Sequence, residues 1–77
     1  MTAQEIRIYM EAAPFIPVNL VTFSGDSYLI PHPDFLTFSP TGRTCLVYAE
    51  DGEFFTALNV GTIADVELVR RRAAGAN

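Results

Sequence analysis

Residues 43–59, with the sequence RTCLVYAEDGEFFTALN, decide the fold. Residues 43–49 and 53–59 are both rich in β-branched and aromatic side chains, which favour strands. Between them, Glu50-Asp51-Gly52 has the composition of a turn. Two strand-forming runs joined by a short turn predict an antiparallel hairpin. The chain is therefore expected to consist mainly of short antiparallel strands.

Two further strands are expected upstream of this hairpin, over residues 17–23 and 27–38, separated by turn-forming residues. The second is a long strand with extended segments over residues 27–30 and 35–38. Pro31 and Pro33 interrupt it, and because proline has no amide donor they predict a bend or a sheet edge. Such a break inside one long strand would supply the curvature that a small barrel needs.

The alternation of side chains assigns faces to two strands. In the first strand, one face is predicted to carry Val18, Leu20 and Thr22. A last strand is expected over residues 63–69, after an interruption at Val60-Gly61-Thr62. One of its faces is predicted to carry Ile63, Asp65 and Glu67, and the other Ala64, Val66 and Leu68.

The N-terminus has the signature of a helix. Thr2 and Glu5 match a capping box, in which each side chain binds a backbone amide that the helix leaves free. Apolar residues follow at helical spacing, and Pro14 cannot continue the hydrogen-bond ladder. We expect one helix over about residues 2–13.

One helix followed by short antiparallel strands with tight turns predicts a mainly β fold. The specific expectation is a strongly bent five-stranded antiparallel barrel, of Sm-like or SH3-like type, preceded by the helix. A single domain should span residues 1–69. Residues 70–77 have little to bury and are expected to form a mobile basic tail.

The charge of the chain is uneven. Residues 1–69 contain nine acidic residues but only Arg7 and Arg43 as basic side chains, which gives a net charge of −7. The tail adds Arg70, Arg71 and Arg72 and brings the total to −4. An acidic body repels phosphate groups at long range, so nucleic-acid binding is possible but disfavoured. The tail arginines could meet nucleic acid, acidic lipid, the acidic body of a neighbour or only solvent.

The chain is unusually apolar for its size. Hydrophobic residues make up 49% of the 77 residues, more than one small domain is expected to bury. Large exposed apolar patches usually mark interfaces, so the expected partner is another copy of the chain. Because Phe54 and Phe55 are adjacent, one of them should lie outside the core. The predicted oligomer interface consists of Phe54, Phe55, Ile63, Val66 and Leu68.

Few residues carry chemistry. Cys45 is the only cysteine and is interpreted as a small strand residue, with no disulfide or cysteine metal cluster to form. His32, between two prolines and beside Asp34, is interpreted as a turn residue, and ligand binding is the alternative. No catalytic, cofactor or metal site is predicted, so the protein is expected not to be an enzyme. Without a basic N-terminal region or a long apolar run, we expect a cytoplasmic protein that does not enter a membrane.

The order of these elements resembles the Sm-like family, including its bacterial Hfq branch. The first motif would cover residues 18–48 and the second residues 54–68, with a one-turn break at Val60-Gly61-Thr62. The resemblance implies a ring-shaped homo-oligomer in which the fifth strand pairs with the fourth strand of the neighbour. Members that bind RNA carry a basic element in the second motif, where this chain has Asn59-Val60-Gly61.

The chain is also similar to a set of short, uncharacterised bacterial proteins, a similarity that implies no function. The shared features are Pro14-Phe15, Ser24-Gly25, His32-Pro33-Asp34-Phe35-Leu36 and Ser39-Pro40.

Two functions follow as hypotheses. The first is a non-enzymatic homo-oligomeric module that acts through protein contacts, with a ring as the assembly that the Sm-like resemblance implies. The alternative is an Sm-like RNA-binding ring that uses Arg43 and the tail arginines Arg70, Arg71 and Arg72.

Overall fold

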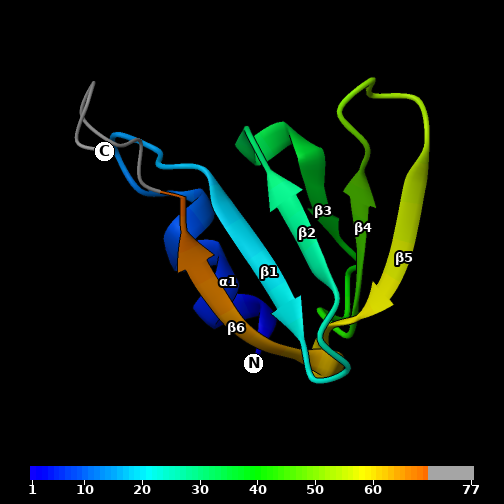
Figure 1. The fold of residues 1–77 in the computed structure, drawn as a ribbon. Coiled ribbons are helices and arrows are strands. Elements are labelled where there is room, and N and C mark those ends of the chain that lie inside the picture. The colour runs from blue at the N-terminus through cyan, green and yellow to red at the C-terminus, as the bar shows by residue number, and fades with distance from the viewer. Residues whose placement is uncertain (70–77) are drawn as a thin grey trace.

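The computed structural model describes residues 1–69, and the predicted basic tail lies outside them. One helix precedes six strands (Figure 1). In chain order the elements are α1 (Ala3–Met10), β1 (Val18–Thr22), β2 (Ser27–Ile30), the 3₁₀ helix η1 (Pro33–Phe35), β3 (Leu36–Phe38), β4 (Thr44–Tyr48), β5 (Phe55–Asn59), the 3₁₀ helix η2 (Val60–Thr62) and β6 (Ile63–Leu68). The prediction of a mainly β fold with one N-terminal helix is confirmed.

The strands form two three-stranded antiparallel sheets, ordered β2-β1-β6 and β3-β4-β5. Figure 1 shows the first sheet on the left, with α1 behind it, and the second on the right. The expected closed five-stranded barrel is not confirmed. The reason lies at Pro31 and Pro33: together with η1, they separate β2 from β3, so the expected long strand is divided into two strands that belong to different sheets.

The helix begins as its capping box predicts. The Thr2 hydroxyl accepts a hydrogen bond from the Glu5 amide at 3.2 Å, and a Glu5 carboxylate oxygen accepts one from the Thr2 amide at 2.8 Å. These bonds lower the pKa of the Glu5 carboxyl group, the bond to the Thr2 backbone amide most strongly. The helix ends at Met10, three residues earlier than predicted, and the Glu11 amide closes its last turn by donating to the Arg7 carbonyl.

A single core joins the helix to both sheets. Ile6, Val18, Leu20, Ile30 and Ile63 are completely buried, and Cys45 is 1% exposed. The remaining buried members of the cluster are Leu36, Val47, Val60 and Val66. Thr22 is also buried, so the predicted inner face of β1 is confirmed. Burial raises the pKa of the Cys45 thiol, as expected for a cysteine that acts as a strand hydrophobe.

The predicted faces of the last strand are wrong at Ile63, whereas the register places Asp65 and Glu67 on one face and Val66 and Leu68 on the other, as predicted. Ile63 and Val66 are both buried, although strict alternation would place them on opposite faces. The pairing of β1 with β6 shifts register, since Thr22 pairs with Ile63 whereas Val21 pairs with Asp65. This bulge leaves Ala64 unpaired and brings Ile63 to the same face as Val66.

Candidate functional site

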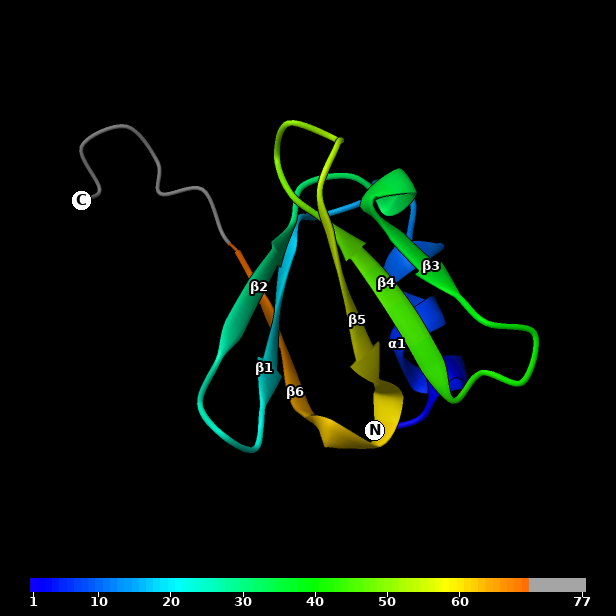
Figure 2. The same ribbon diagram turned by 90° about the vertical axis from the view of Figure 1, so that its right-hand side faces the viewer.

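Strand β5 is the most exposed strand of the structure. All its residues are exposed except the half-buried Leu58, and none carries a charge. Among residues 1–69, β5 pairs with β4 only, so its other side is a free sheet edge. Figure 2 views the molecule from this side and shows β4 on one flank of β5. A free, uncharged strand edge is a template for pairing with another chain.

The hydrogen-bond ladder shows which groups of β5 point outward. The Ala49 amide donates to the Phe54 carbonyl at 2.7 Å, and the Val60 amide donates to the Arg43 carbonyl at 2.8 Å. Because hydrogen-bonded pairs alternate along an antiparallel ladder, the even-numbered residues of this segment bond to β4. The amide and carbonyl groups of Phe55 and Ala57 are therefore directed away from the sheet and towards a potential partner.

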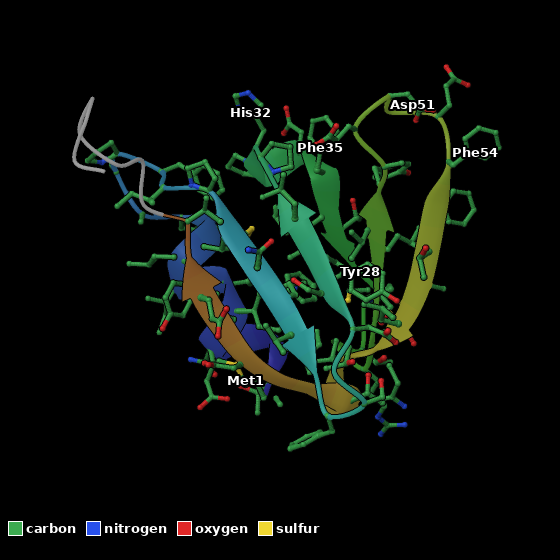
Figure 3. The ribbon with its side chains drawn as sticks, in the orientation of Figure 1. Met1, Tyr28, His32, Phe35, Asp51 and Phe54 are labelled. Atoms are coloured by element: carbon green, nitrogen blue, oxygen red, sulfur yellow. The ribbon has the colours of Figure 1, made fainter. Side chains whose placement is uncertain are left out.

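Two aromatic rings stand beside this edge. Phe54 is 74% exposed and Phe55 is 58% exposed, so neither enters the core. The Phe55 ring packs against Tyr48 with 5.9 Å between ring centroids. Phe54 projects outward from the end of the β4–β5 turn (Figure 3) and, with Tyr28, lines a hollow of about 260 Å³ between β2 and β5. The sequence predicted one exposed phenylalanine, and the structure exposes both.

The other three residues of the predicted interface do not lie at the β5 edge. Ile63 is completely buried and Val66 is 7% exposed, so both side chains belong to the core of the single chain and are withdrawn from the interface. Ile63 reaches the core face through the bulge between β1 and β6, whereas Val66 pairs with the buried Leu20. Leu68 is 38% exposed at the end of β6, away from the β5 edge.

Strand β6 is also an edge strand among the described residues, but its outward side is less accessible to a pairing strand. The Val69 amide donates to the Pro17 carbonyl at 2.8 Å, which places the odd-numbered residues of this segment in the bonded pairs with β1. The Val66 amide therefore points outward, and the Asp65 carboxylate accepts its hydrogen bond at 2.8 Å. The same strand carries Glu67. Acidic side chains on an edge discourage pairing with another strand.

A second hollow, of about 490 Å³, lies between the start of α1, the β3–β4 turn and η2. Arg7 and Arg43 line it together with Asn59 and Gly61, and none of its lining residues is acidic. The Arg7 guanidinium also lies 4.7 Å from the centre of the Phe38 ring. The sequence singled out Arg43 but missed Arg7, which lies in α1. The other predicted nucleic-acid contacts, Arg70, Arg71 and Arg72, lie outside the described residues.

His32 lies at the opposite end of the molecule from Met1 (Figure 3). Its side chain is exposed and makes no capping hydrogen bond to η1, while its carbonyl accepts one from the Phe35 amide at 3.0 Å. Its ring centroid is 6.3 Å from that of Phe35. Within residues 1–69, no group of three or more His, Cys, Asp or Glu side chains is placed to hold a metal ion.

The described part of the chain contains no helix with the length and apolar character needed to cross a membrane.

Comparison with known proteins adds no assignment. No protein-family model matches the sequence, and neither the curated proteins nor the solved structures give a significant match. The function is therefore argued from the surface of this chain alone.

Proposed function

We propose that the protein is a non-enzymatic module that associates with copies of itself through the edge of β5. The observation that carries this proposal is an exposed, uncharged edge strand whose outward amides and carbonyls lie beside Phe54 and Phe55. Pairing with a second chain would satisfy these backbone groups and cover the two rings. Burial of apolar area of this kind is the main favourable term in association.

The net charge of residues 1–69 supports the β5 edge as the site of self-association. Residues 1–69 carry a net charge of −7, so two copies repel each other at most orientations. Strands β4 and β5 contain no charged residue. On the outer face of their sheet, the register places Leu46 beside Ala57 and Tyr48 beside Phe55. A contact there brings uncharged surfaces together and leaves the carboxylates in solvent.

The Sm-like barrel remains part of the proposal. Its support is the order of the two sheets, in which β6 lies beside β1 and β5 beside β4, with η2 as the one-turn break between β5 and β6. The contact between β2 and β4 brings the two sheets together. The cytoplasm is the proposed location.

The test compares two exposed alanines, one on the edge of β5 and one on the edge of β6. Ala57→Lys places a charge in the middle of β5, and Ala64→Lys places the same charge on β6. Light-scattering mass on a sizing column, over a range of protein concentrations, should show a multimer for the wild type and for Ala64→Lys. Ala57→Lys should reduce the mass towards 8.5 kDa. A wild type that stays monomeric at every concentration would overturn the proposal.

RNA binding is the second candidate function, and the hollow lined by Arg7 and Arg43 favours it. Two guanidinium groups and no lining carboxylate make this region a local exception on an acidic surface. Such contacts give salt-sensitive attraction to phosphates. Fluorescence anisotropy with a labelled single-stranded RNA should show binding that weakens in Arg43→Ser and in a variant with Ser at Arg70, Arg71 and Arg72. Equal binding by the wild type and both variants, or no binding by the wild type, would exclude this candidate.

A further inference from the structure

We infer that two copies join through their β5 strands, antiparallel and related by a two-fold axis at Ala57. This inference rests on the proposed self-association and specifies its geometry. It predicts a closed dimer with one six-stranded sheet in the order β3-β4-β5-β5-β4-β3. The alternative is pairing of β5 with β6 of the next copy, which is the ring arrangement implied by the Sm-like resemblance.

The edges of β5 and β6 are not equivalent, and this difference favours pairing of β5 with β5 over pairing of β5 with β6. Pairing with β6 requires its outward Val66 amide, which already donates to the Asp65 carboxylate at 2.8 Å. A partner strand would have to displace that bond and lie against Asp65 and Glu67. The outward groups of Phe55 and Ala57 have no comparable side-chain competitor among the described hydrogen bonds of the strand. A second β5 meets no carboxylate within the strand.

The length of β5 sets the register. The strand runs from Phe55 to Asn59, so Ala57 is its centre. Antiparallel pairing about that centre places Ala57 opposite the partner's Ala57 and Phe55 opposite the partner's Asn59. All these residues have their backbone groups directed outward, so they would form the hydrogen-bonded pairs of the new ladder. The Asn59 carbonyl already accepts a hydrogen bond from the Thr62 hydroxyl at 2.7 Å, so the new bond would use its second lone pair. The small side chain of Ala57 at the axis lets the two copies of this residue face each other without a steric conflict.

Charges at the two ends of β5 are complementary in this arrangement. The acidic turn with Glu50, Asp51 and Glu53 precedes the strand, whereas Arg43 is bonded through its carbonyl to Val60 just after the strand. A two-fold axis at Ala57 brings the acidic turn of each copy towards the Arg43 end of the other. Parallel pairing would instead place the two acidic turns side by side, which is unfavourable.

A disulfide at the axis tests the symmetry directly. In Ala57→Cys, two-fold pairing places each new thiol opposite its own copy, with an expected Cα–Cα distance of about 5.5 Å in a hydrogen-bonded pair. That distance lies within the range for a disulfide, roughly 4.4–6.8 Å. Mild oxidation should convert Ala57→Cys to a covalent dimer on a non-reducing gel. The wild type, whose only thiol is the buried Cys45, serves as the control and should stay uncrosslinked.

The ring arrangement gives a different result. Ala57→Cys would not crosslink to itself, but would do so when mixed with Ala64→Cys or with Leu68→Cys on β6. A multimeric mass together with crosslinking only in these mixtures would overturn the two-fold inference and leave the proposed self-association intact. A monomeric mass at every concentration, without crosslinking, would overturn both. A dimeric mass with efficient crosslinking of Ala57→Cys alone is the expected result.

Discussion

Replacement of Gly42 by alanine tests how the N-terminal helix is held against the sheets. Gly42 ends the β3–β4 turn with φ +74°, and its amide donates to the Ser39 carbonyl at 2.9 Å. A Cβ atom at this position would lie 3.2 Å from the Cβ of Ala3, at the start of α1. Gly52, in the β4–β5 turn, has nearly the same φ, +76°, and a Cβ there would meet nothing within 4 Å. The two glycines have nearly the same backbone conformation, and only Gly42 faces the helix α1.

The expected losses of folding free energy follow from the positive φ at both glycines and from the contact with Ala3 at Gly42 alone. An alanine in the left-handed region costs about 1–2 kcal/mol at either position. The smaller entropy of the unfolded chain after Gly→Ala is the same for both variants and cancels in the comparison. At Gly42 the added methyl group must also displace Ala3, and overpacking of this kind costs about 1–3 kcal/mol. Gly52→Ala should therefore lose about 1–2 kcal/mol and Gly42→Ala at least about 1 kcal/mol more.

The assay is urea unfolding followed by far-ultraviolet circular dichroism, with the same protein concentration for all variants. Both substitutions should be made in the Ala57→Lys background, because self-association would add a concentration-dependent term to the free energy of unfolding. Ala3→Gly removes the opposing methyl group and should recover most of the additional loss in Gly42→Ala. Equal losses for Gly42→Ala and Gly52→Ala would refute the predicted contact between α1 and the β3–β4 turn.

Four further outcomes are expected. Ile63→Ala should lower the free energy of unfolding in urea by about 2–5 kcal/mol because the side chain is completely buried, whereas Leu68→Ala should cost less than about 1.5 kcal/mol. Thr2→Ala should cost about 1 kcal/mol in the same assay through loss of the helix cap, and an unchanged midpoint would contradict the capping box. Because the pKa of Glu5 is lowered in the folded protein, its carboxylate stabilises the fold above the ordinary pKa of 4.5. This stabilisation is lost as the pH falls through the pKa of the folded state. Thermal melts from pH 7 to pH 3 should therefore show a smaller loss of Tm in Glu5→Gln than in the wild type. Asp65→Ala should free the second edge and raise the light-scattering mass above that of the wild type, and an unchanged mass would show that this carboxylate does not protect β6.

Local patterns predicted much of the fold. The capping box of Thr2 and Glu5 depends on residues three apart, and the alternation of Val18, Leu20 and Thr22 depends on neighbours within one strand. Turns were predicted because glycine adopts a positive φ without strain, as Gly42 does here. These signals are carried by short stretches of chain and need no knowledge of distant residues.

The predicted site was less complete. Phe54 and Phe55 were identified because two adjacent residues of a strand cannot face the same way, but the exposure of both depends on β5 being an edge. Arg7 was missed as a neighbour of Arg43, since the two are brought to one hollow only when α1 packs beside the β3–β4 turn. The burial of Ile63 depends on a bulge that no pattern within β6 reveals, and that of Val66 depends on its pairing with the buried Leu20 of β1.

The sequence by itself determined the elements, their approximate bounds, the acidic body and the apolar surplus. Local patterns could not predict which strand edges are free, because the order of strands in a sheet depends on pairing between segments far apart in the chain. Only the tertiary structure decided that the edge of β6 is blocked by Asp65 while that of β5 is open, since the direction of each amide follows from the register with its neighbour. The long strand expected through Pro31 and Pro33 became two strands in two sheets for the same reason: proline marks a break, but long-range packing decides where the chain goes after it.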